Sequence, residues 1–180
     1  MMQSILRIIL LLVIANGSLW AETAEPEWQL SSPDGNTIEF PDQRDGPVVL
    51  VFWASWCPYC RALMPHLQTM LDEFADKNLR VYAINFRDDG DPQAYLRRHG
   101  LEFLSLANGG EVAKLYEIHG TPGLLIFDKR NQRILNIYDV MAEYNAKQIP
   151  TDGLSHTQIA AQKVPYWADK IRHTIAQLDD

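Results

Sequence analysis

The only two cysteines of the chain lie three residues apart, in the segment Trp56-Cys57-Pro58-Tyr59-Cys60. A run of β-branched and aromatic residues precedes this segment and a helical pattern follows it, so we expect Cys57 at the beginning of a helix. Unpaired backbone N–H groups and the positive end of the helix dipole stabilise a thiolate there. The pattern therefore predicts a lowered pKa for the Cys57 thiol and makes Cys57 the nucleophile of thiol–disulfide exchange.

Cys60 is expected one helical turn further along, close enough to attack a mixed disulfide formed at Cys57. Pro58 suits the first turn of a helix, where no backbone N–H is needed. A purely structural disulfide is a weaker interpretation, because closing so short a loop constrains the unfolded chain little. A metal site would need more ligands, and the histidines are scattered along the sequence, at His66, His99, His119, His156 and His173. We expect no metal and no cofactor besides the cysteine pair.

The first residues, Met1 to Ala21, have the pattern of a secretory signal peptide. Arg7 is followed by the unbroken apolar run Ile8–Ala15, as in the charged and apolar regions of such peptides. We expect cleavage after Ala21 and export to the periplasm or a comparable compartment, where disulfide bonds form and persist. An uncleaved membrane anchor is the alternative, although the apolar run is shorter than the roughly 20 residues that span a bilayer.

Length and charge limit the remaining possibilities. A chain of 180 residues fits one domain with an additional N-terminal segment, and we expect residues 22–180 to form that domain as a monomer. The chain has 16 Lys and Arg against 23 Asp and Glu, with a net charge of −7. An acidic surface without a basic stripe argues against nucleic-acid binding, which requires neutralisation of phosphates.

Strand and helix patterns alternate along the rest of the chain. Short strands at 28–30 and 37–40 flank Asp34-Gly35, a strong hairpin signal. Val48–Trp53 is expected to be a strand buried on both faces, and a helical pattern runs from Pro58 to Asn78. Further strands are expected at 79–85, 101–107, 123–127 and 134–138, and further helices at 91–99 and 111–118. This order predicts an α/β domain with a central mixed sheet flanked by helices.

The C-terminal part carries weaker signals. Residues 139–165 contain Pro150, Pro165, the turn pair Asp152-Gly153 and no clear period. We therefore expect an irregular crossover there. Residues 166–178 regain helical spacing, which predicts a C-terminal helix that packs back on the sheet.

From about residue 28 to residue 138 the sequence resembles the thioredoxin superfamily, and within it the exported TlpA/ResA/DsbE-type thiol–disulfide oxidoreductases. The residues that carry the resemblance are Asp34-Gly35, VVLVFWASWCPYC at 48–60, Pro65 and HGTPGLLIFD at 119–128. The resemblance implies a thioredoxin-like fold in which Pro122 is a cis-proline facing the two cysteines. It also implies that the backbone of Thr121 pairs with an extended substrate. The groove beside Cys57 would then be formed by Trp56, Tyr59, Gly120, Thr121 and Pro122.

The activity implied by the resemblance is reduction of protein disulfides, with Cys57 and Cys60 as the catalytic pair and Pro58 positioning them. The implied partners are a protein thiol or disulfide substrate and a membrane electron donor. Two other functions stay open, namely a disulfide-donating oxidase or isomerase and a non-catalytic module that binds a metal or a partner.

The sequence departs from these families at two positions. The buried Asp that many thioredoxins have six residues before the first cysteine is Val51 here. The Glu that cytochrome c biogenesis members often have three residues after the second cysteine is Leu63. Both acids are taken to assist proton transfer at the second thiol. We therefore expect slower resolution or a different proton acceptor, and the departure argues against a role as an apocytochrome c reductase.

Overall fold

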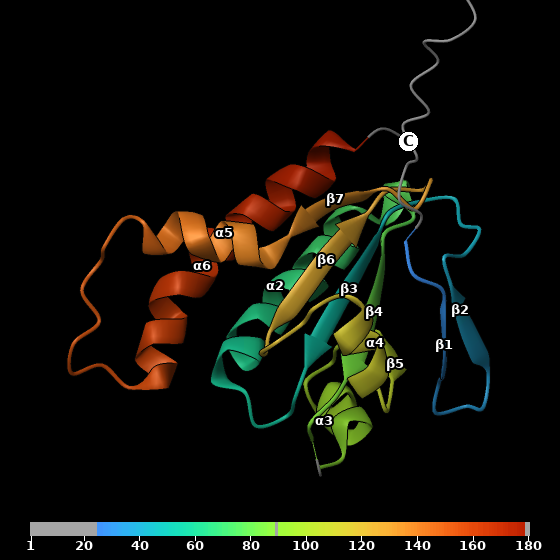
Figure 1. Cartoon of the computed structure of the whole chain (residues 1–180), viewed down its shortest axis with the longest axis horizontal. Coiled ribbons are helices and arrows are strands. Elements are labelled where there is room, and N and C mark those ends of the chain that lie inside the picture. The colour runs from blue at the N-terminus through green and yellow to red at the C-terminus, as the bar shows by residue number, and fades with distance from the viewer. Residues whose placement is uncertain (1–24, 89, 179–180) are drawn as a thin grey trace, which may run out of the picture.

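A five-stranded mixed sheet forms the centre of the protein (Figure 1). The structure is a computed structural model and describes residues 25–88 and 90–178. In spatial order the strands are β5 (Leu104–Leu106), β4 (Arg80–Asn85), β3 (Val48–Trp53), β6 (Gly123–Phe127) and β7 (Arg133–Asn136). The β3–β4 and β4–β5 pairs are parallel, whereas β6 is antiparallel to both of its neighbours. The predicted mixed sheet is confirmed.

Both faces of the sheet are covered, which explains why β3 is apolar throughout. Successive strand residues point to opposite faces. Val49 and its alternate neighbours pack with α2 (Pro58–Glu73) and α6 (His156–Gln177). Val48 and its alternate neighbours pack with the N-terminal hairpin and with α4 (Gly110–Leu115). Every residue of β3 is therefore buried.

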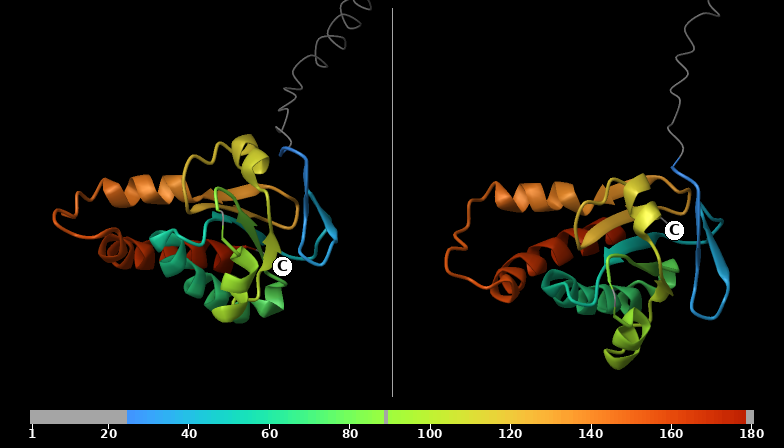
Figure 2. Two further views of the ribbon diagram at one scale, coloured as in Figure 1. Left: turned by 90° about the horizontal axis from the view of Figure 1, so that it is seen from below. Right: turned by 60° about the horizontal axis from the view of Figure 1, so that its bottom comes forward.

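The N-terminal hairpin forms a second, two-stranded sheet of β1 (Trp28–Ser31) and β2 (Thr37–Phe40). It lies beside the main sheet in both views of Figure 2. Trp28 stacks on Phe40 with ring centroids 5.2 Å apart, and its indole N–H donates to the Tyr116 hydroxyl at 3.1 Å. The hairpin expected around Asp34-Gly35 is confirmed, and Gly35 has the positive φ of 86° that favours glycine.

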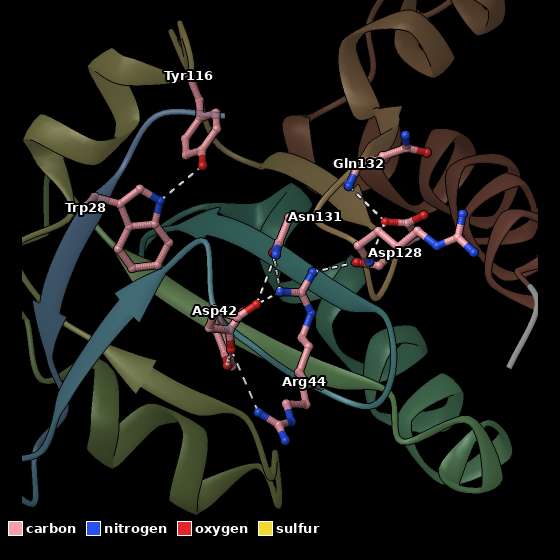
Figure 3. A network of polar contacts seen from close by, with 10 residues as sticks. Trp28, Asp42, Arg44, Tyr116, Asp128, Asn131 and Gln132 are labelled. Atoms are coloured by element: carbon pink, nitrogen blue, oxygen red, sulfur yellow. Dashed lines mark hydrogen bonds and ion pairs between the residues drawn. The ribbon is translucent and has the colours of Figure 1, made fainter. Parts of the chain in front are cut away.

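A polar network connects the chain after the hairpin with the turn between β6 and β7 (Figure 3). This turn lies beside the beginning of β3, whereas Cys57 follows the end of β3. The side chain of Arg44 is fully buried there. Its guanidinium donates to Asp42, to Asn131 and, at 2.6 Å, to the Asp128 carbonyl. Asp128 follows the last residue of β6, so Arg44 connects the chain after the hairpin with the end of a central strand.

The expected irregular crossover at 139–165 is wrong. Most of α5 (Ile137–Asn145) lies in this range, together with the first half of α6, which begins at His156 instead of residue 166. Figures 1 and 2 both show the connection between these helices projecting beyond the sheet. Ser155 and Gln158 form a reciprocal capping box that fixes the beginning of α6.

Pro165 lies inside α6, where it removes a backbone donor and disturbs the preceding turn. The hydroxyl of Tyr144 in α5 reaches the Gln162 carbonyl in that turn, at 3.4 Å. This contact joins α5 to α6 in the turn before the proline, and α6 continues through Pro165.

The other elements lie near their expected positions. The helix beginning at Pro92 ends at Arg98 (α3), and a short 3-10 helix at Ala75–Lys77 follows α2. The short strand expected within 101–107 is β5. Within residues 25–88 and 90–178, no helix has both the length and the apolar character needed to cross a membrane. The expected signal peptide, residues 1–21, lies outside the described residues.

Candidate active site

The two cysteines lie where β3 passes into α2. The backbone N–H of Cys57 donates to the Ala54 carbonyl at 3.1 Å, which turns the chain out of the strand. Cys57 is the N-cap of α2, and Pro58 is the first helical residue, as expected. The Cys57 sulfur accepts a hydrogen bond from the Cys60 backbone N–H at 3.1 Å. The two cysteines form a disulfide, with Cα atoms 5.3 Å apart.

The local geometry suits a thiolate at Cys57. An N-cap side chain normally provides an oxygen that accepts from the first turn of the helix, and here the sulfur takes that place. When the pair is reduced, the same backbone N–H and the helix dipole stabilise negative charge on the sulfur. Cys57 is 1% exposed and Cys60 is fully buried. The side chains around Cys57 therefore control access to its sulfur.

The turn before β6 lies directly opposite the cysteines. Gly123 pairs with Phe52 of β3 in antiparallel register, which places the preceding residues beside the end of β3. The Cys57 sulfur is 3.5 Å from the Thr121 carbonyl oxygen. The Thr121–Pro122 peptide bond is cis, which confirms what the resemblance implied.

Tyr138, which sequence reasoning placed at the end of a strand, fixes this turn. It lies in the first turn of α5, and its hydroxyl accepts from the backbone N–H groups of His119 and Gly120, both at 3.1 Å. The same hydroxyl donates to the Gly120 carbonyl at 3.2 Å. Spacing along the chain gives no signal for this contact, because the two partners lie in different elements.

Of the predicted groove residues, Trp56 and Tyr59 lie in different surroundings. Trp56 is 56% exposed beside Cys57. Tyr59 is partly buried and points to the C-terminal helix, where its ring stacks on Trp167 with centroids 6.0 Å apart and meets His156 edge-on at 6.2 Å. The structure thus brings Trp56, Gly120, Thr121 and the cysteines together, and a substrate contact for Tyr59 stays a prediction.

The connection between β4 and α3 also borders the site, which the sequence did not indicate. The Asp88 carboxylate accepts from the Ser55 backbone N–H and, at 3.0 Å, from the Ser55 hydroxyl. It also accepts from the Asn85 side chain at 2.9 Å and from the Gly90 N–H at 3.0 Å. Burial acts to raise the pKa of Asp88, but these hydrogen bonds together outweigh it and lower the pKa.

The departures at Val51 and Leu63 leave apolar side chains, both fully buried, in the core around the cysteines. Among the residues that the structure describes, the buried polar side chains are Ser32, Arg44, Asn85 and Ser105, none of them an acid. Across the same residues, no group of three or more His, Cys, Asp and Glu side chains is arranged to bind a metal ion.

The sequence matches the model of a known protein family and is similar to several known proteins. The model of the AhpC/TSA family matches residues 22–135. Thiol-disulfide oxidoreductase ResA from Bacillus thuringiensis is 26% identical over 115 residues, which cover 62% of this chain and 66% of the relative. ResA from Oceanobacillus iheyensis is 31% identical over 107 residues, 55% of each chain. The aligned region thus spans less than two thirds of the length of these relatives.

The fold has a solved counterpart in a secreted disulfide oxidoreductase from Mycobacterium tuberculosis. The two structures superpose with a TM-score of 0.57 at 19% identity, over 84% of this chain and 96% of the other. This similarity establishes the thioredoxin-like fold. Helices α5 and α6 lie beyond residue 135, where the match to the family model ends.

Proposed function

Because this chain belongs to the AhpC/TSA family of thioredoxin-like proteins, we propose that it is a thiol–disulfide oxidoreductase that reduces disulfide bonds in protein substrates. The observation that carries the proposal is the sulfur of Cys57 at the N-cap of α2, hydrogen-bonded by the Cys60 N–H. A sulfur held there is stabilised as a thiolate, the form that attacks disulfides. The curated relatives are named for the same chemistry.

The reaction proceeds in two exchanges. The Cys57 thiolate attacks one sulfur of the substrate disulfide, so that a Cys57–substrate bond forms, the substrate disulfide breaks and one substrate thiolate leaves. Cys60, after losing its proton, attacks the Cys57 sulfur and releases the second substrate thiolate. The protein ends with the Cys57–Cys60 disulfide, and the substrate has gained two electrons and, from solvent, two protons.

Proton removal from Cys60 is the step for which this chain lacks both acids that the resemblance described above would lead us to expect. Leu63 and Val51 offer no acceptor, and Cys60 is fully buried. Water that reaches Cys60 in the mixed disulfide, or the departing substrate thiolate, takes the proton. We expect resolution by Cys60 to be the slower of the two exchanges.

The groove places the substrate. Trp56 provides an exposed apolar wall, and the Thr121 backbone, close to the Cys57 sulfur, offers hydrogen bonds to an extended peptide on the opposite side. Gly120 and Pro122 are proposed to complete this wall, and a substrate contact for Tyr59 would require its ring to leave Trp167. A disulfide in a flexible or unfolded segment is the substrate that fits.

Each cycle leaves the pair oxidised, so a second partner has to return two electrons. We propose that the protein is exported, that its signal peptide is cleaved after Ala21 and that a membrane electron donor reduces the cysteine pair. A monomer suffices for this cycle.

Trapping of the intermediate tests the proposal. Reduced Cys60→Ser protein is mixed with insulin, a protein held by disulfides, and is expected to accumulate a covalent adduct that dithiothreitol releases. Cys57→Ser is the matched control and forms none. The wild type is expected to accelerate the reduction of insulin by dithiothreitol, with only transient adducts. If Cys60→Ser forms no adduct, or Cys57→Ser forms one equally well, the proposed function is wrong.

A further inference from the structure

We propose that Arg87 is a positioning residue that ties the two walls of the substrate groove together. The inference rests on the proposed function and adds a specificity determinant outside the cysteine and cis-proline segments. Arg87 lies in the connection between β4 and α3, and it contacts both walls through different atoms.

The first contact is made by the backbone. The indole N–H of Trp56 donates to the Arg87 carbonyl at 2.9 Å. Trp56 is the most exposed of the large apolar side chains that the structure describes, and without this bond its ring would be free to change rotamer. The Arg87 carbonyl therefore fixes the wall that stands next to Cys57.

The second contact is made by the side chain. The Arg87 guanidinium donates to the His119 carbonyl at 3.2 Å, one residue before Gly120 and two before Thr121. The guanidinium also lies over the Phe86 ring, 5.3 Å from its centroid, which holds the extended side chain in place. One residue thus joins the Trp56 wall to the turn that leads to Pro122.

The backbone of Arg87 is adapted to this geometry. Its φ is 56°, in the left-handed region that non-glycine residues rarely adopt. Such a conformation costs free energy and persists only where the surroundings enforce it. The adjacent Asp88 carboxylate accepts from the backbone and side chain of Ser55, immediately before Trp56. Asp88 and the Arg87 carbonyl thus connect the same loop to Ser55 and to Trp56.

A fixed distance between the walls matters for a large substrate and not for a small one. An extended peptide has to contact the Trp56 ring and the Thr121 backbone at the same time. A small disulfide needs only the Cys57 sulfur, which Arg87 does not touch. Loss of the Arg87 side chain should therefore weaken binding of protein substrates while leaving the chemistry of the cysteine pair unchanged.

Arg87→Asn tests this, because Asn tolerates the left-handed conformation but is too short to reach His119. Insulin reduction is measured with dithiothreitol as the electron source. We expect the KM for insulin to rise about three- to tenfold, because the variant loses one hydrogen bond. The kcat for insulin and the rate with hydroxyethyl disulfide should stay within about twofold of the wild-type values. This is the result expected when a mutation removes an interaction that is equally strong in the ground state and the transition state. Arg87→Lys, which keeps one donor, should restore part of the affinity.

Arg98→Asn is the matched control, since it makes the same charge change at an exposed position in α3. An unchanged KM for insulin in Arg87→Asn would overturn the inference. So would an equal loss with both substrates, or an equal effect of Arg98→Asn. If Arg87→Asn does not fold, Arg87→Gly gives the same comparison without backbone strain. If the wild type reduces insulin and Arg87→Asn does so equally well, only the role of Arg87 is refuted. If the wild type does not reduce insulin, the proposed function is refuted, and this inference with it.

Discussion

Two arginines approach the same carboxylate at the end of the sheet remote from the cysteines, and they should differ sharply in their effect on stability. Arg44 has a fully buried side chain and contacts Asp42, whereas Arg80 is 46% exposed and lies 3.8 Å from the same carboxylate. Removal of one partner of a buried pair leaves the other charge and its hydrogen-bond partners unsatisfied in a medium of low dielectric constant.

The expected magnitude follows from what Arg44→Met would leave behind. The Asp42 carboxylate would keep the Tyr82 hydroxyl at 3.0 Å, but the Asp128 carbonyl and the Asn131 side chain would each lose a donor (Figure 3). Breaking a buried pair costs about 3–5 kcal/mol. Because Asp42 is 19% exposed and water can reach it, we expect a loss near the lower end, about 3 kcal/mol. Arg80→Met should cost less than about 1 kcal/mol.

Urea unfolding followed by tryptophan fluorescence measures both losses, and thermal unfolding provides a check. A loss of about 3 kcal/mol lowers Tm by about 6–12 °C in a protein of this size. Insulin reduction by folded Arg44→Met should match the wild type, because the network lies at the opposite end of β3 from Cys57. If both arginine variants cost the same, or Arg44→Met costs less than about 1 kcal/mol, the buried pair does not act as described.

Two further predictions concern hydrogen bonds near the site and in the hairpin. Asp88→Asn should lower the free energy of unfolding by about 1–3 kcal/mol near neutral pH. Because the pKa of Asp88 is lowered in the folded protein, this difference should be complete above the usual Asp pKa of about 4 and vanish as the pH falls through the folded value. Urea unfolding of both proteins across a pH series measures this difference in the free energy of unfolding. A difference that does not change with pH would show that the charge of Asp88 does not contribute to stability. Trp28→Phe should cost about 1–3 kcal/mol because it strands the buried Tyr116 hydroxyl. Trp167→Phe should cost less, since the buried indole N–H of Trp167 has no hydrogen-bond partner among the residues that the structure describes. Equal losses in urea unfolding would contradict this explanation.

The sequence predicted the centre of the fold well because the signals there are local. The apolar run Val48–Trp53, the helical spacing after Pro58 and the hairpin turn at Asp34-Gly35 each reflect short-range geometry, and all three elements are present. The cis bond before Pro122 could be anticipated only through the family resemblance, because most bonds before proline are trans.

Helix α5 and the first half of α6 were missed because two prolines outweighed a readable pattern. Ile137, Val140 and Tyr144 are the buried residues of α5 and have helical spacing. Ser155 and Gln158 carry the signature of a helix N-terminus. Pro165 lies inside α6, where a local pattern predicts that a helix ends.

The contacts of Tyr138, Arg87 and Asp88 at the site were missed for the same physical reason. Each joins segments that are far apart in the sequence, such as Arg87 with His119 and Asp88 with Ser55. Asp91, in the same connection, has a local role instead, because it caps α3 by accepting from the Ala94 N–H at 2.8 Å. Only the packing of three loops around the cysteines reveals what the others do.

The reduction potential of the Cys57–Cys60 pair tests the central proposal most directly, because it decides the direction in which electrons flow. Equilibration of the purified protein with defined thiol buffers measures it. A reductase is expected to have a potential near the roughly −270 mV of thioredoxin. A potential close to roughly −120 mV, typical of a strong disulfide donor, would contradict the proposed reductase and identify an oxidase or isomerase.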